Sequence, residues 1–227
     1  MAEDVKNIAV EEKEATIAFG AKERKLITDP LHLNNPLTVQ VLGICSAMAV
    51  TSQVYPSLIM AVAVVFVTAF SSLIISLLRN SVPSSIRMIV QLLVIAALVQ
   101  VVSLVLGAFA YSAYESLAVF IGLIITNCIV MGRLEAFAMA NRPWQSFLDG
   151  VGNGLGYGFI LVAMAVIREL FGKGTIMGLE ILNPIFGLFG ATYTPNNLMV
   201  LPAASLFVIG LMIWVQRGLD DRLVDIS

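Results

Sequence analysis

Charge is what this sequence lacks most. Only 12% of its 227 residues are charged, 59% are hydrophobic, and the mean hydropathy is +0.92. A soluble domain carries charge on roughly a quarter of its residues. The composition therefore excludes an ordinary soluble protein and predicts an all-α integral membrane protein surrounded by the lipid bilayer. The net charge of −2 offers no basic surface, and we expect no nucleic-acid partner.

Cysteine and histidine are also scarce, with two cysteines and one histidine in the chain. Cys45 and Cys128 lie in apolar segments rather than in loops, so they do not resemble the disulfide framework of a secreted domain. His32 stands alone and offers no metal-binding pattern. The sequence contains no phosphate loop, dinucleotide fingerprint or hydrolytic triad. We therefore expect no complete active site on this chain.

Charge-free runs locate the membrane spans. A full crossing needs about 20 residues, and the runs predict six transmembrane helices, of which the first and fourth are short for a crossing. The six helices are expected near residues 38–52, 57–78, 86–109, 116–132, 150–171 and 197–215. The predicted organisation is a charged N-terminal tail at 1–32, a six-helix membrane domain at 33–217 and a C-terminal tail at 218–227.

Lysines and arginines predict the orientation of these spans. With six spans and a cytoplasmic N-terminus, all but two of the 13 cations, Arg168 and Lys173, fall on the cytoplasmic side. Because cytoplasmic loops of membrane proteins are enriched in Lys and Arg, we expect both termini in the cytoplasm.

The two halves of the chain repeat one plan. Each half has a short helix that contains a cysteine, a long apolar helix that ends at Arg79 or Arg168, and a third helix. If the halves are inverted in the bilayer, a pseudo-two-fold axis in the membrane plane brings Cys45 and Cys128 together at the midplane. We therefore predict two inverted three-helix repeats.

The cysteine pair allows two interpretations. A buried free cysteine is usually a small packing residue. However, Cys45 adjoins Ser46, Cys128 adjoins Thr126 and Asn127, and polar groups at membrane depth commonly line sites. A thiolate in hydrocarbon needs a compensating cation, which iron in a cluster supplies, and the usual cluster shell is four thiolates. This chain brings two, so metal binding requires a second chain with two more. Both interpretations stay open on the residues alone.

A glycine run and two acidic residues complete the candidates. Glycines alternate from Gly150 to Gly158 and fall on two faces of one helix, which favours close helix packing over chemistry. Asp149, just before this run, is expected to cap the helix, with cation handling as the alternative. Glu135 is expected to pair with Arg133 or Arg142 at the cytoplasmic surface.

Several segments together carry a family resemblance that covers roughly residues 30 to 217. They are Asn34–Thr51, Ser76–Asn80, Ile86–Gln91, Ile124–Ala138 and Asp149–Gly158. These segments resemble the family that contains NqrD and NqrE, two membrane subunits of the bacterial Na⁺-translocating NADH:quinone reductase, and the paired membrane subunits of Rnf complexes. The Gly-Ile-Cys-Ser form at Cys45 and the Asn-Gly-Leu-Gly-Tyr-Gly run that starts at Asn153 favour the NqrD branch.

The resemblance implies a specific role. NqrD and NqrE form an inverted pair in the bacterial inner membrane and share a mid-membrane [2Fe-2S] cluster, to which each gives two cysteines. The matching positions are Cys45 and Cys128. The cluster relays electrons between flavins of other subunits in a six-subunit complex, on the path from NADH to ubiquinone, and this electron flow drives Na⁺ export. The acidic position implicated in Na⁺ handling falls on Asp149.

Two alternatives remain at this point. One is the equivalent subunit of an Rnf complex, which exchanges electrons between ferredoxin and NAD. The other is a secondary transporter, in which inverted repeats and short helices are also typical.

Overall fold

The computed structural model describes residues 26–30, 35–80, 82–109, 120–176, 179–180 and 197–219. Its helices are α3 (Ile44–Val50), α4 (Val54–Leu78), the 3-10 turn η1 (Ser84–Ile86), α5 (Arg87–Phe109), α7 (Cys128–Arg133), the π-helix η2 (Leu134–Ala138), α8 (Pro143–Lys173), α10 (Asn197–Val200) and α11 (Pro202–Leu219). Two strands of two residues each, β1 (Thr175–Ile176) and β2 (Leu179–Glu180), pair antiparallel. The predicted all-helical class is confirmed, apart from this short hairpin.

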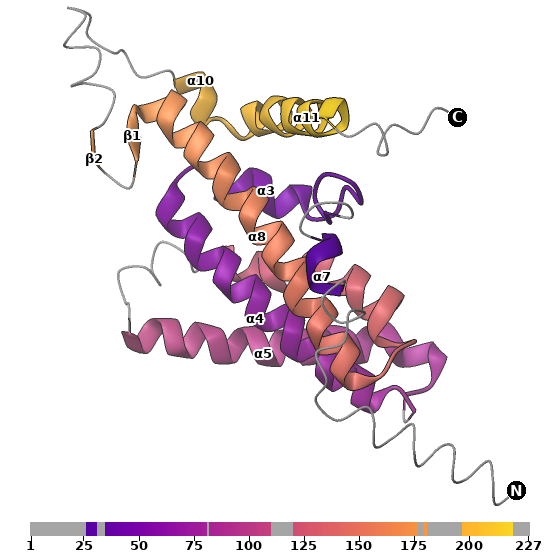
Figure 1. The fold of residues 1–227 in the computed structure, drawn as a ribbon. Helices are drawn as coiled ribbons and strands as arrows, with labels where there is room; N and C mark the ends of the chain where they lie inside the picture. The colour runs from indigo at the N-terminus through magenta and orange to yellow at the C-terminus, as the bar shows by residue number, and fades with distance from the viewer. Residues whose placement is uncertain are drawn as a thin grey trace, which may run out of the picture.

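Helices α4 and α8 form the centre of the molecule, where they run side by side (Figure 1). Helix α5 packs on α4 and extends to one side of this pair in Figure 1, whereas α11 extends to the other. The short helix α3 packs against α11 and α4. Side chains from these helices form one buried apolar core that includes Val64, Ile95, Leu161 and Met164.

The glycine run lets two other segments pack closely on two faces of α8, as the sequence predicts. A Cβ at Gly150, Gly154 or Gly158 would lie 2.8, 2.8 and 3.0 Å from the nearest atom of α4. A Cβ at Gly152 or Gly156 would lie 2.7 and 2.5 Å from backbone carbonyl oxygens of residues 26–30. Real side chains do not tolerate contacts this short, so only glycine permits this packing. Residues 26–30, which the sequence assigns to the N-terminal tail, are helical and pack on α8 here.

Four helical segments are long and apolar enough to cross a membrane: Val54–Leu78, Arg87–Ala108, Phe120–Ala138 and Pro143–Lys173. The apolar helix Pro202–Gly218 is shorter. These five segments match the second to sixth predicted helices in position. The first predicted helix, near 38–52, corresponds to α3, which has only 7 residues. The chain is therefore a multi-pass membrane protein. Four helices in the described part have spanning length, but they include the fourth predicted helix, which the sequence predicts to be short, and not the helix at Pro202–Gly218.

Several boundaries differ from the predicted ones. The first helix begins at Ile44 rather than near 38, because residues 35–43 form hydrogen-bonded turns instead. The fourth helix is interrupted at Thr126 and Asn127 and then continues to Ala138, so it is not short. The fifth helix begins at Pro143, before its glycine run, because a proline at the first helical position suits a helix start. The predicted tails at 1–25 and 220–227, His32 and the connection around 181–196 lie outside the described residues.

Candidate metal centre and charged cluster

Both cysteines lie at the beginning of short helices. Cys45 is the second residue of α3, and Cys128 is the first residue of α7. The chain turns into α3 through Val41 and Gly43, whose φ angles are 57° and 80°. Two constraints require glycine at position 43. A residue with a Cβ would be strained at this φ, and the Cβ would lie 2.9 Å from Cε2 of the Tyr157 ring.

Cys45 and Cys128 line one small cavity. This cavity has a volume of about 30 Å³ and is lined by Gly43, Cys45, Ser46, Leu123, Thr126, Asn127 and Cys128. Both cysteines are exposed at the surface of the single chain. Neither thiol is buried by this chain's own side chains, and both interpretations of the pair stay predictions. A pair of accessible thiols is what a site completed by a second chain requires.

A hydrogen-bonded triad lies behind these thiols. Ser46 Oγ donates to the Gly43 carbonyl at 2.9 Å, pairs with the Tyr157 hydroxyl at 2.6 Å and accepts from Asn127 Nδ2 at 3.2 Å. Asn127 also caps α7, since its Oδ1 accepts from the Ile129 amide at 3.2 Å. The triad therefore connects the beginnings of both cysteine-bearing helices to the middle of α8.

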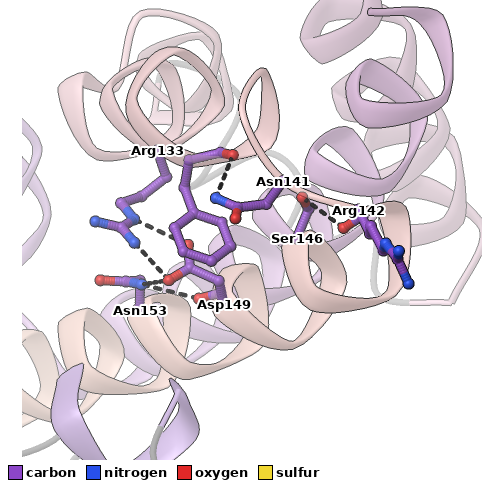
Figure 2. Close-up of polar contacts among 7 residues, drawn as sticks. Arg133, Asn141, Arg142, Ser146, Asp149 and Asn153 are labelled. Atoms are coloured by element: carbon purple, nitrogen blue, oxygen red, sulfur yellow. Dashed lines mark hydrogen bonds and ion pairs between the residues drawn. The ribbon is translucent and has the colours of Figure 1, made fainter. Parts of the chain in front are cut away.

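Asp149 does not cap the glycine helix, and that expectation is wrong. Helix α8 begins at Pro143, so Asp149 lies in its second turn, where the backbone amides are already paired. Its carboxylate instead pairs with Arg133 through both oxygens, with Nε to Oδ2 at 3.0 Å (Figure 2). Asn153 Nδ2 also donates to Asp149 Oδ1 at 3.0 Å. A bidentate arginine is a strong partner for a buried carboxylate.

A polar cavity of about 140 Å³ adjoins this ion pair. Its polar lining comes from Asp29, Gln40, Arg133, Asp149 and Asn153. The Asn153 Oδ1 atom is buried and has no hydrogen-bond partner within the described residues. Oxygen atoms of this kind are the ligands that hard cations prefer.

Glu135 has a different partner from the one predicted. It pairs with Arg87 at the start of α5 and accepts from Gln91 Nε2 at 2.9 Å. Arg133 is occupied by Asp149, and Arg142 is the residue that precedes α8. Glu135 lies in the π-helix η2, and its side chain reaches α5 from there.

Two arginines bind the ends of short helices across the molecule. Arg168, only 1% exposed, donates from Nη1 to Thr51 Oγ1 at 2.5 Å, just after α3, and from Nη2 to the carbonyls of Val200 and Leu201. Arg79 Nη1 donates to the Asn141 carbonyl at 2.9 Å, just after η2. Each arginine thus lies near the end of one long helix, and Arg168 binds the chain after α3 while Arg79 binds the chain after η2.

Sequence reasoning missed Tyr157 and Ser46 as partners and missed the Arg133–Asp149 pair. The available signals were a single bulky residue, Tyr157, within a run of glycines, and a carboxylate in an apolar helix. Neither signal indicates which residue the side chain contacts. Ser46 and Tyr157, for example, are 111 residues apart in the sequence. Within the described residues no group of three or more His, Cys, Asp or Glu side chains gathers to hold a metal.

Fold and site together define a class: a multi-pass helical membrane protein that presents two accessible thiols at the beginnings of two short helices beside a glycine-packed central helix. The chain belongs to the family described as "Rnf-Nqr subunit, membrane protein", which matches residues 24–213. Its relatives include the D subunit of the Na(+)-translocating NADH-quinone reductase of Shewanella baltica (strain OS155 / ATCC BAA-1091), which is 55% identical over 90% of this chain and 97% of the relative. The same subunits of Shewanella frigidimarina (strain NCIMB 400) and Shewanella oneidensis are 55% and 54% identical over the same shares. The resemblance predicted from the sequence is confirmed.

Proposed function

We propose that this chain is an electron-relay subunit of a Na⁺-translocating NADH:quinone reductase in the bacterial inner membrane. The observation that carries the proposal is the pair of exposed thiols, Cys45 and Cys128, on one cavity. Relatives named as the D subunit of this reductase, at 55% identity, support it over the Rnf and transporter alternatives. The NADH, flavin and quinone sites belong to other subunits, so this chain contributes to the enzyme without a complete active site.

The donor set fits a shared [2Fe-2S] cluster. Such a cluster takes four thiolates, this chain offers two, and a homologous, inverted partner subunit of the NqrE type would supply the others. When bound, the cluster supplies one-electron transfer between the flavins of neighbouring subunits. The chain's own contribution is to place two thiols at the beginnings of α3 and α7, where a partner subunit can reach them.

An inverted repeat is the architecture that this function needs, and the arginine contacts support it. Helix α3 would correspond to α7 with η2, α4 to α8, and α5 to α11. Arg168 near the end of α8 binds the chain after α3, and Arg79 at the end of α4 binds the chain after η2. Inverted halves would make this pair of contacts equivalent.

Removal of the thiols tests the proposal. Cys45→Ala or Cys128→Ala should each remove the cluster's iron and stop NADH-driven quinone reduction, because a bare alkyl group cannot ligate iron. NADH oxidation by an artificial acceptor should survive, since that site lies on another subunit. Iron per purified complex, acid-labile sulfide and both activities are the measurements.

Gly122→Ala is the matched control, because a Cβ at Gly122 meets no atom within 4 Å. It adds one methyl group in the helical segment before Cys128 and should leave iron and activity unchanged. A shared metal also stabilises the assembly, so iron is scored per assembled complex. Normal iron content and quinone reduction in a well-assembled Cys45→Ala, Cys128→Ala double variant would reject the relay function.

A further inference from the structure

Ser46 has no hydrogen-bonding capacity left over. A serine hydroxyl has one proton to donate and two lone pairs to accept with. Its proton goes to the Gly43 carbonyl at 2.9 Å, so the Tyr157 hydroxyl at 2.6 Å and Asn127 Nδ2 at 3.2 Å are its two donors. All three contacts are buried, since Ser46, Asn127 and Tyr157 are 3%, 3% and 0% exposed. Buried and fully satisfied polar networks rigidify the elements that they join.

Each member of the triad adjoins the thiol cavity or the turn that leads into it. Ser46 follows Cys45 directly, and Asn127 precedes Cys128 directly. The Asn127 amide is held at both ends, because its Oδ1 also accepts from the Ile129 backbone amide. The Ser46–Asn127 bond is therefore a direct link between the two cysteine-bearing segments, 81 residues apart in the chain.

Tyr157 anchors this link to the rest of the fold. It lies on α8 between Gly156 and Gly158, which pack against residues 26–30 and α4. Its ring lies on Gly43, the residue before α3, so the ring fixes the turn while the hydroxyl holds Ser46. The side chain is fully buried and cannot move without opening this packing.

We propose that Tyr157, through Ser46 and Asn127, is a positioning residue that holds Cys45 and Cys128 at a fixed separation before any partner or metal binds. The assignment of the metal rests on the proposed function, whereas the positioning of the two thiols does not. A preorganised thiol pair ligates a metal without the cost of ordering two free helix ends.

Cross-linking of the two thiols tests the positioning without a metal. The purified full-length chain, with both thiols reduced, is treated with dibromobimane, which fluoresces strongly once both of its ends have reacted. Tyr157→Phe keeps the ring and removes only the hydroxyl. The cross-linked fraction should fall roughly two- to tenfold, the population change expected for the loss of one hydrogen bond. Tyr55→Phe is the matched control, because Tyr55 on α4 is 49% exposed.

A double-mutant cycle tests whether Tyr157 acts through Ser46. Ser46→Ala should lower the cross-linked fraction at least as far as Tyr157→Phe, and the combined variant should fall no further than Ser46→Ala alone. Additive effects, an unchanged fraction in Tyr157→Phe, or a wild-type chain that does not cross-link would each overturn the proposal.

The intact complex gives a second readout. Tyr157→Phe should retain iron while altering the g values or line width of the EPR spectrum of the reduced centre, and Tyr55→Phe should not. A Tyr157→Phe complex with the wild-type spectrum would show that Tyr157 does not position Cys45 and Cys128 for the metal. If Cys45→Ala and Cys128→Ala leave the iron content unchanged, the proposed function fails, and cross-linking still decides the positioning of the thiols.

Discussion

Asp149 lies in an ion pair beside a polar cavity. Its carboxylate oxygens are already bound by Arg133 and Asn153. A Na⁺ ion that uses this carboxylate must therefore compete with the guanidinium of Arg133. The adjoining cavity, with Asp29 and the unpartnered Asn153 Oδ1, provides further oxygen ligands. We propose that Asp149 takes part in Na⁺ handling, as the family resemblance implies.

Asp149→Asn tests this role. The variant keeps the shape of the side chain and removes its charge, so the apparent affinity for Na⁺ should fall about tenfold, the effect of one charged ligand. Na⁺ titration of quinone reduction in assembled complexes measures this change. Glu135→Gln is the matched control, because it leaves another arginine, Arg87, without its carboxylate. An Asp149→Asn complex with wild-type Na⁺ dependence would remove Asp149 from the cation path.

At the scale of elements, consecutive charges on α8 hold helix ends that the bilayer would otherwise leave unpaired. Glu169 Oε2 accepts from the Val54 amide at 2.6 Å and so caps α4. Arg168 binds the carbonyls of Val200, the last residue of α10, and of Leu201, and it also binds the Thr51 side chain just after α3. Carbonyl and amide groups at helix ends lack partners within their own helix. Two adjacent charged residues thus secure the ends of three helices.

Arg168→Lys should destabilise the chain by roughly 3 kcal/mol, because a lysine cannot reach several carbonyls at once with a planar fork of donors. Arg217→Lys is the control, since Arg217 is exposed on α11. Denaturant unfolding of the purified chain in detergent measures both. Equal stability of the two variants would show that the Arg168 contacts contribute nothing.

The α4–α8 contact gives a second prediction at this scale. Gly154→Leu places a branched side chain where a Cβ alone would lie 2.8 Å from the Val65 Cα. Overpacking should push α4 away from α8, at a cost of about 3 kcal/mol or more, and lower the yield of assembled complex. Gly210→Leu on α11 is the control, because its Cβ meets no atom within 4 Å. Normal yield of the Gly154→Leu complex would contradict the packing.

At the scale of the whole molecule, the outer helices present a strongly apolar surface. Leu93 on α5 and Phe207 and Trp214 on α11 are 69%, 83% and 73% exposed in the single chain. Side chains this apolar must be covered by lipid or by other subunits. The surface therefore agrees with a chain that lies in a bilayer within a larger assembly.

The topology of the chain is testable as a whole. The distribution of lysines and arginines predicts both termini in the cytoplasm. A C-terminal reporter that is active only in the cytoplasm should therefore be active, and the same reporter inserted after Lys173 should be inactive. An active reporter after Lys173, or an inactive one at the C-terminus, would reject the six-span arrangement.

The sequence by itself determined the helices and their setting. In a bilayer every backbone polar group must be paired locally, so long apolar runs become helices wherever they occur. The glycine spacing likewise determined that α8 is approached on two faces. Both properties depend on composition along a single segment.

Only the tertiary structure decided which side chains meet. The partners of Asp149, Glu135 and Tyr157 depend on the depth, rotation and breaks of different helices. The π-helix and the interruption before Cys128 set these positions, and no local pattern predicts either. Cys45 and Cys128 do line one cavity, where the repeated plan of the sequence places them, because tertiary packing brings together segments that are distant in the chain.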